Sequence, residues 1–336
     1  MKITLLKVFH SLKRIMLALI AIPLAFFMLC VPVWGYGSFY SLDLNDRISP
    51  PGEMIDLGSH ELHLNCSGEG LPTVILEAGS GGWSASWAGV KNLLSEEVRV
   101  CAYDRAGLGW SERGPNPRNA ATIATELRQL LDIADENAPW LFVGHSFGGT
   151  IGLTFIENNP EMVAGFVAVE TPTYSFMKYR HETRFILRGL GRKMLGPYST
   201  VTGSAVSILK SQYLNSQTGA VYSDQELAMI NDPGFKMKMA AMITKEEPYI
   251  ESLEPSKKVR AFPVAVVQGA ASHLVSPQWN QNQQELLAMS EKSRIFMAHQ
   301  AHHGVPRMAP EVIIEAVNWV RMNMNEADTI YANHLE

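Results

Sequence analysis

The sequence predicts an α/β protein with a doubly wound, mostly parallel eight-stranded sheet, an inserted helical cap and an N-terminal transmembrane helix. Three observations predict this: an uncharged N-terminal segment, short apolar runs that alternate with helical patterns, and one long interruption of the alternation. The chain has 336 residues, of which 46% are hydrophobic and only 18% are charged. That length suits one large domain that carries an insertion.

The first element is an apolar segment over residues 15–36, preceded by a basic stretch. About 20 apolar residues span a bilayer core, whereas the apolar part of a signal peptide has about 7–15. Basic residues flank only the N-terminal side, which places residues 1–14 in the cytoplasm and the rest of the chain outside it. The basic residues are Lys2, Lys7, Lys13 and Arg14.

A cleaved signal peptide is the alternative interpretation of this segment. Residues 31–35 contain one poor small-residue cleavage site. Cleavage there would produce a secreted or periplasmic protein instead of a single-pass membrane protein.

After a linker over residues 37–53, short apolar runs predict eight strands. The first two runs alternate and predict a hairpin, and the others are nearly continuous, as expected of parallel strands covered on both faces. The runs are residues 54–57, 61–66, 73–76, 98–103, 140–143, 165–169, 262–267 and 294–297. Helical patterns lie between several of them, at residues 121–134, 150–157, 281–289 and 311–321.

The alternation stops over residues 172–260, which carry helical patterning and are too long for a connection. We predict a helical cap there, inserted between two parts of the core, residues 54–171 and 261–325. A tail over residues 326–336 follows. In such a sheet, ligands bind at the carboxyl ends of the strands.

The motif Gly144-His145-Ser146-Phe147-Gly148 predicts a nucleophile elbow, because a strand precedes it and a helix follows it. The turn is so tight that the positions of Gly144 and Gly148 require small residues. Ser146 is therefore the predicted nucleophile.

A serine hydroxyl needs a base and a group that orients the base. In folds with this elbow the chain order is serine, acid, histidine. Residues 298–304 read AHQAHHG after the last predicted strand. We favour His303 as the base, since it stands shortly before the helix that opens at Pro310, and His302 is the alternative.

Residues 54–323 resemble the α/β-hydrolase superfamily, and within it the serine members of the epoxide-hydrolase-like and haloalkane-dehalogenase-like branch. The motifs that carry the resemblance are HELHLNCSGEG, TVILEAGSGG, VCAYDRAGLGWSE, FVGHSFGGT and AHHGVPRMAPE. Ser146 stands where dehalogenases and epoxide hydrolases have aspartate. The resemblance therefore implies acyl transfer to water, with no metal or cofactor.

The sequence departs from this family at the triad acid. Most relatives place an aspartate soon after the seventh strand, but residues 269–277 read GAASHLVSP and contain no carboxylate. Some members of the branch supply the acid after the sixth strand, where this chain has Glu170. Glu170 is therefore the predicted acid. The alternative is that Glu170 bonds only local backbone and that the site is impaired.

The oxyanion hole is expected to comprise the backbone N–H of Phe147 and one donor from the loop at residues 79–82. By resemblance the second donor is Ser80 or Gly81, and we favour Ser80. Asp104 and Arg105 match a motif that usually supports the loop near the elbow.

Three cysteines exclude a disulfide scaffold, and the formal net charge of −5 argues against a nucleic-acid-binding protein. Cys66 and Cys101 lie on the second and fourth strands, which pair in this family. Two buried thiols are the commoner outcome for such a pair, and a disulfide is the alternative outside the cytoplasm.

The sequence thus predicts a membrane-anchored serine hydrolase that cleaves a carboxylic ester outside the cytoplasm. Its partners are a small ester, with lipid-like esters one candidate class, and the bilayer. One alternative is an aminopeptidase or amidase, in which a cap carboxylate binds the substrate amine; Glu246, Glu247 and Glu251 are the candidates. Another is a non-catalytic binding protein on a hydrolase fold.

Overall fold

The central element of the protein is a sheet of eight strands in the order β1-β2-β4-β3-β5-β6-β7-β8. The strands are β1 (Glu53–Asp56), β2 (Glu61–Ser67), β3 (Val74–Glu77), β4 (Val100–Tyr103), β5 (Trp140–His145), β6 (Val163–Val169), β7 (Val264–Gly269) and β8 (Ser293–Ala298). The computed structural model describes residues 2–40, 42–178, 201, 222–232, 234–236, 238–239, 259–270 and 277–324.

Only the first two strands depart from the parallel direction. β1 pairs antiparallel with β2, and β2 pairs antiparallel with β4, while β3 to β8 run parallel. The central strands are buried on both faces, as their nearly continuous apolar sequences require. The predicted mostly parallel α/β sheet is therefore confirmed.

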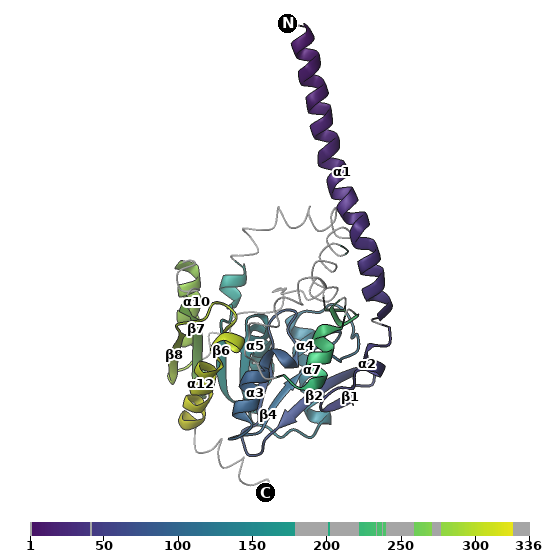
Figure 1. Ribbon diagram of the computed structural model, residues 1–336. Coiled ribbons are helices and arrows are strands. Elements are labelled where there is room, and N and C mark those ends of the chain that lie inside the picture. Colours follow the sequence, from purple (N-terminus) through teal and green to yellow (C-terminus); the bar gives the residue numbers. More distant parts are fainter. Residues whose placement is uncertain are drawn as a thin grey trace.

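Two layers of helices cover the sheet (Figure 1). α4 (Ala120–Ile133), α5 (Phe147–Asn158) and α10 (Pro277–Leu287) contribute to the hydrophobic core on one face, and α3 (Ala88–Leu94) and α12 (Pro310–Asn323) to that on the other. The smaller helices are α2 (Leu44–Arg47), α7 (Asp224–Asn231), α11 (Val305–Met308), η1 (Ser84–Trp87) and η2 (Pro160–Met162), the last two being 3-10 helices.

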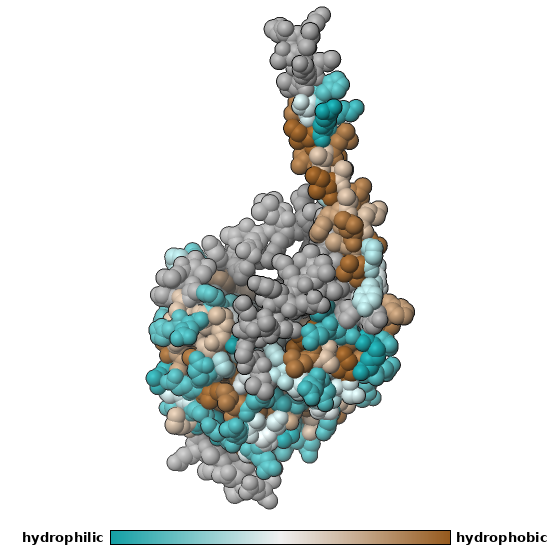
Figure 2. All heavy atoms as spheres, in the orientation of Figure 1, coloured by the Kyte–Doolittle hydropathy of each residue, from teal (hydrophilic) through white to brown (hydrophobic). Residues whose placement is uncertain are grey.

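The N-terminal helix α1 (Lys2–Tyr40) projects away from the rest of the molecule (Figure 1). Figure 2 shows its apolar side chains on the outer surface, uncovered by the core. The segment His10–Phe39 is long and apolar enough to cross a membrane, and only 6% of its most apolar window is buried. A membrane anchor and a signal sequence share these properties.

The segment after α1 packs on the core of the sheet and its helices. Leu44 is only 3% exposed and lies in an apolar cluster with Trp83 and Trp110. The Trp110 indole Nε1 donates to the carbonyl oxygen of Ile48 at 2.9 Å, and His63 Nε2 donates to that of Pro51 at 2.5 Å. These residues of the predicted linker therefore contribute to the folded core.

Cys66 and Cys101 form a disulfide bond, so the expectation of two free thiols was wrong. They are direct partners in the antiparallel register of β2 and β4. Directly opposed residues on antiparallel strands have their Cβ atoms close together, which places the two sulfur atoms within bonding reach.

Most of the predicted cap, the loop at residues 271–276 and the tail lie outside the described residues. In the described part, α7 contributes Met229 to the cluster around Trp83 and Trp110. Phe235 packs on Trp83 with ring centroids 4.7 Å apart.

We predict that the free energy of unfolding is about 4 kcal/mol higher for a chain beginning at Leu42 than for one beginning at Glu53. The difference corresponds to burial of Leu44, about 2 kcal/mol, and two hydrogen bonds of about 1 kcal/mol each. Urea unfolding of both chains, followed by tryptophan fluorescence, measures it. Equal unfolding midpoints and slopes would contradict the packing role of residues 42–52.

Candidate active site

Ser146 occupies the turn between β5 and α5 with a strained backbone, at φ 52° and ψ −121°. The turn brings its flanking residues against other backbone atoms. A Cβ atom on Gly148 would lie 2.3 Å from the carbonyl oxygen of Glu77, and one on Gly144 would lie 2.5 Å from the Cα of Gly149. Only glycine fits at both positions, as the sequence motif predicts.

The structure brings Ser146, His303 and Glu170 together in one chain of hydrogen bonds. His303 Nε2 lies 2.8 Å from Ser146 Oγ, and His303 Nδ1 lies 3.1 Å from Glu170 Oε2. A carboxylate only accepts hydrogen bonds, so Nδ1 carries the proton in the neutral ring and Nε2 accepts from the serine hydroxyl. This tautomer is the one that a general base requires.

Glu170 follows β6 and is 1% exposed. Its backbone N–H donates to the carbonyl oxygen of Val267 at 2.9 Å, and its φ of 49° turns the chain after the strand. Its Oε1 accepts the backbone N–H of Gly269, at the end of β7, at 2.8 Å. One carboxylate oxygen is thus held by the neighbouring strand while the other faces His303.

His302, the alternative base, is exposed, and in the described part of the chain its side chain forms neither of the hydrogen bonds that His303 makes. The two histidines are adjacent in the same loop, and their contacts favour His303 as the base.

The predicted oxyanion loop lies against the nucleophile. A Cβ atom on Gly79 would be 3.4 Å from the Cβ of Ser146. Ser80 follows in this loop, which closes with a hydrogen bond from the N–H of Gly82 to the carbonyl oxygen of Gly79 at 2.8 Å. Phe147 is the first residue of α5, so its N–H has no acceptor within the helix.

Arg105 holds this loop through hydrogen bonds to its main chain. Its guanidinium donates to the carbonyl oxygens of Ala78 at 2.6 Å and Gly79 at 2.7 Å, and to Glu77 Oε1 at 2.7 Å. Glu77 is fully buried and also accepts from the Tyr103 hydroxyl. The buried carboxylate neutralises the buried guanidinium, which explains why both residues are tolerated beside the site.

Asp104 has a similar supporting position and forms no contact with His303 in the described residues. Its carboxylate accepts the backbone N–H groups of Ser84 at 2.7 Å and Trp110 at 2.9 Å, and pairs with His63 Nδ1 at 2.8 Å. Burial opposes its ionisation, but His63 and the two N–H groups outweigh burial and hold the pKa of Asp104 below its usual value. Asp104 and Arg105 therefore have the loop-supporting contacts expected from the motif.

His145 is a site residue that sequence reasoning missed. Its Nε2 donates to the carbonyl oxygen of His303 at 2.6 Å, and the two rings lie 4.9 Å apart. Burial, together with the nearby His303, lowers the pKa of His145 to about 3, so the ring is neutral near pH 7. A neutral ring holds the main chain of His303 without adding positive charge beside it. Its position next to Ser146 in the elbow was the available signal.

One group of potential metal ligands occurs among the described residues: Cys66, Cys101 and Glu136. The two sulfur atoms are bonded to each other, and Glu136 pairs with Arg99 at 2.5 Å. Metal coordination by cysteine requires thiolates, so this group does not fit a metal ion in its disulfide form.

The family model described as the alpha/beta hydrolase fold matches residues 72–302. This match covers more than half of the chain, and the chain therefore belongs to the α/β-hydrolase family, a family of hydrolases. The resemblance inferred from the motifs is confirmed.

Two curated relatives show similarity over very different lengths. The chain is 26% identical over 280 residues to an "AB hydrolase superfamily protein" of Gibberella zeae, covering 73% of this chain and 85% of that one. It is 38% identical over 128 residues to "Probable transporter efuK" of Hormonema carpetanum, covering 36% of this chain but only 18% of the relative.

Solved structures with the same fold include hydrolases of different chemistry. An epoxide hydrolase of Bacillus megaterium superimposes with a TM-score of 0.60 at 18% identity, covering 80% of this chain and 100% of the other. A thermophilic esterase of Thermogutta terrifontis superimposes with a TM-score of 0.59 at 17% identity, covering 82% and 100%. At these identities the likeness shows the fold alone.

We predict that His145→Gln makes the protein less sensitive to acid, because glutamine keeps an N–H donor but does not titrate. The pKa of His145 is about 3 in the folded protein, below its unfolded value of about 6.5. The neutral ring therefore contributes stability that is present above pH 6.5 and is lost as the pH falls toward 3. Wild type should lose about 2 kcal/mol more than the variant between pH 7 and 5.

Urea unfolding at several pH values measures this difference. His302→Gln is the matched control, because His302 is exposed; its pH dependence should follow that of wild type. The same loss in wild type and His145→Gln would show that His145 titrates normally.

Proposed function

We propose that this protein is a serine hydrolase that cleaves a carboxylic ester through an acyl-enzyme intermediate. The observation that carries the proposal is the chain of hydrogen bonds from Ser146 through His303 to Glu170, at 2.8 and 3.1 Å. These contacts have the geometry of a nucleophile, its base and the group that orients the base.

In the first step, Ser146 Oγ attacks the ester carbonyl carbon while His303 Nε2 takes the hydroxyl proton. Glu170 stabilises the imidazolium that forms. The N–H groups of Phe147 and Ser80 bind the oxyanion of the tetrahedral intermediate. When the intermediate collapses, His303 gives its proton to the departing alcohol, and the acyl group remains on Ser146.

In the second step, water attacks the acyl-enzyme. His303 takes a proton from the water molecule, and the same two N–H groups bind the second oxyanion. Collapse releases the carboxylic acid, and the proton on His303 returns to Ser146. Every proton transferred in the two half-reactions is therefore accounted for by Ser146, His303, water and the products.

Epoxide hydrolysis through a nucleophilic residue is the weaker proposal, although an epoxide hydrolase has the same fold. A carboxylate nucleophile would form an ester with the epoxide carbon, and water can cleave an ester. Ser146 would form an ether instead, which water does not cleave under the same conditions. The serine therefore favours acyl substrates.

Two alternatives receive less support. The aminopeptidase or amidase alternative depends on Glu246, Glu247 and Glu251, which lie outside the described residues. The non-catalytic alternative depended on a missing acid, and the hydrogen bond between Glu170 and His303 weakens it. An ester therefore remains the proposed substrate.

We further propose that α1 is an uncleaved membrane anchor and that the hydrolase lies outside the cytoplasm. Lys2, Lys7, Lys13 and Arg14 precede the uncharged residues 15–36 of this helix, which favours a cytoplasmic N-terminus. The disulfide between Cys66 and Cys101 supports the same side, because disulfides persist in oxidising compartments.

We predict that Glu170→Gln lowers kcat for a chromogenic short-chain ester by roughly 10²–10⁴-fold. The glutamine Nε2 would donate to His303 Nδ1, which forces the ring into the tautomer that cannot accept the serine proton. Ser146→Ala and His303→Gln should lose activity at least as severely, while His302→Gln should keep it. Thermal unfolding should show that all four variants remain folded.

Labelling with a fluorophosphonate, followed by peptide mass spectrometry, tests the nucleophile itself. Wild type should carry one label on Ser146, and the denatured protein should carry none. A folded wild type that is neither labelled nor active on esters would favour the binding-protein alternative. Unchanged kcat in Glu170→Gln would exclude Glu170 as the acid.

We predict that thiol alkylation of isolated membranes dissolved in a denaturing detergent modifies only Cys30 before reduction. Cys66 and Cys101 should react only after a reductant has been added, because they are bonded to each other. Cys30 serves as the internal control for alkylation. Complete reaction of Cys66 and Cys101 without reductant would indicate a reducing compartment.

A further inference from the structure

A polar pocket lies at the junction between α1 and the hydrolase core. Its volume is about 540 Å³, within the range of small-ligand sites. Three separate segments form its walls: the turn after α1, the loop after Trp110, and one residue that follows α7. The lining residues are Leu42, Asp43, Leu44, Asn45, Asp46, Ser111, Glu112, Arg113 and Lys238.

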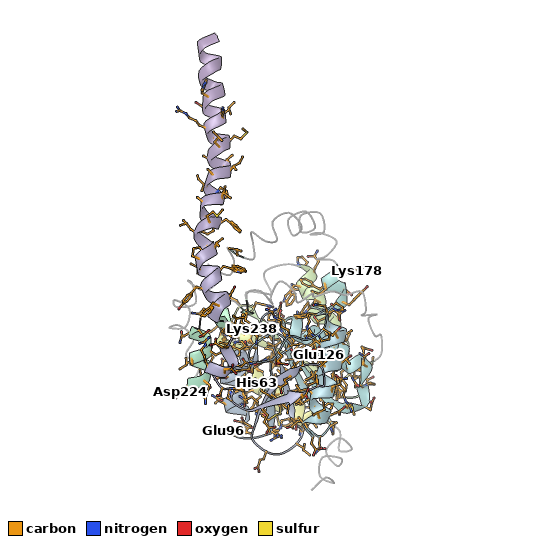
Figure 3. All side chains as sticks on the ribbon, turned by 90° about the vertical axis from the view of Figure 1, so that its right-hand side faces the viewer. His63, Glu96, Glu126, Lys178, Asp224 and Lys238 are labelled. Carbon is orange, nitrogen blue, oxygen red and sulfur yellow. A yellow bond between two sulfur atoms is a disulfide. The ribbon has the colours of Figure 1, made fainter. Side chains whose placement is uncertain are left out.

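The pocket is close to the end of the candidate membrane span. That span ends at Phe39, and the first pocket residue is Leu42. Figure 3 shows Lys238 beside the lower end of α1. If α1 crosses a bilayer, this position corresponds to the headgroup layer, which adds several ångströms to each side of the hydrocarbon core.

The walls of the pocket are held in place by the core. Asn45 Nδ2 donates to the carbonyl oxygen of Trp110 at 2.7 Å, and Arg47 pairs with Asp232 at 2.5 Å. Lys238 Nζ donates to the carbonyl oxygens of Gly109 at 2.9 Å and Ser111 at 2.8 Å. These bonds fix Asn45 and Lys238, and with them the three segments that form the walls of the pocket.

The charges that line the pocket are of both signs. Lys238 and Arg113 are the cations. Burial, together with the nearby charge of Arg113, lowers the pKa of Lys238 to about 8. Asp43, Asp46 and Glu112 are the carboxylates. The side chains of Arg113 and Asp46 have no polar partner among the described residues. A bound anion would stabilise the two cations, and a bound ammonium would stabilise the carboxylates.

The rim of the pocket is apolar on the side of the anchor. Leu42 is 81% exposed and Phe39 is 70% exposed. Side chains of this size in water cost free energy, whereas acyl chains of a lipid would cover them. A ligand that carries both a charged headgroup and an acyl chain matches the polar pocket and its apolar rim together.

We propose that this pocket binds the headgroup of a zwitterionic bilayer lipid, with the phosphate on Lys238 and Arg113 and the ammonium on Asp46, since Asp43 already pairs with Arg47 at 3.0 Å. Such a lipid would attach the hydrolase core to the bilayer surface, in addition to α1. The lining of this pocket includes none of Ser146, His303 and Glu170, and the proposal does not depend on the ester-hydrolase activity.

Native mass spectrometry of the full-length protein tests this proposal. The protein is purified in detergent with an equimolar mixture of phosphatidylethanolamine and phosphatidylglycerol of the same acyl chains. Wild type should retain one phosphatidylethanolamine in at least about fivefold excess over phosphatidylglycerol. Arg113→Gln should lower total retention, and Asp46→Asn should remove the preference between the two lipids.

Arg294→Gln is the matched control, because Arg294 is an exposed cation on β8 outside the pocket. Its lipid retention should equal that of wild type, and thermal unfolding should show that all variants are folded. Equal retention in wild type, Arg113→Gln and Asp46→Asn would overturn the proposal. Displacement of the lipid by an equal concentration of phosphoethanolamine would also overturn it, since the site would then be one for a soluble ligand.

Discussion

The carboxylate of Glu170 is the constraint on which the geometry of the candidate site depends. It is buried, and its two oxygens contact two different parts of the chain, the N–H of Gly269 and the ring of His303. Because β5, β6 and β7 run parallel, their carboxyl ends meet at one edge of the sheet. An acid directly after β6 and a nucleophile directly after β5 are therefore neighbours, and the last loop has only to place one histidine between them. The extra methylene of glutamate, compared with aspartate, provides the reach.

A second set of buried charges supports the other side of the site. Arg105 donates to the carbonyl oxygens of Ala78 and Gly79, which fixes the loop that faces Ser146. Asp104, the preceding residue, accepts N–H groups from Ser84 and Trp110. Such buried groups are stable only when they are fully paired. The pairing explains why this part of the chain keeps charged residues at positions that packing alone would fill with apolar ones.

The strands of the sheet could be predicted from the sequence because each one is a short apolar run. Strands that are buried on both faces need such runs, so few other segments of the chain qualify. The sequence was also sufficient for the elbow, where Gly144 and Gly148 have almost no room for a side chain. It was not sufficient for α3 (Ala88–Leu94), whose seven residues carry too little periodicity. The contact between His145 and the carbonyl of His303 joins residues 158 positions apart, and no local pattern reports it. The disulfide was underestimated because the register of β2 and β4 decides it, and register is a property of the folded sheet.

The junction between α1 and the core follows from the same long-range pairing. Residues 37–53 read as a linker because they are short, polar and rich in Pro and Gly. In the fold, Asn45 and Ile48 bond to Trp110, and Trp110 bonds through its N–H to Asp104. Asp104 in turn holds Ser84, at the start of the helix that follows the oxyanion loop. A continuous path of hydrogen bonds therefore connects α2, which follows α1, to η1, which follows the loop beside Ser146. Displacement of residues 42–52 would leave the Trp110 indole N–H and His63 Nε2 without their acceptors, the carbonyl oxygens of Ile48 and Pro51, which is costly. Residues 42–52 and the candidate site are for that reason parts of one cooperative structure. A boundary drawn between them from composition alone would divide that structure.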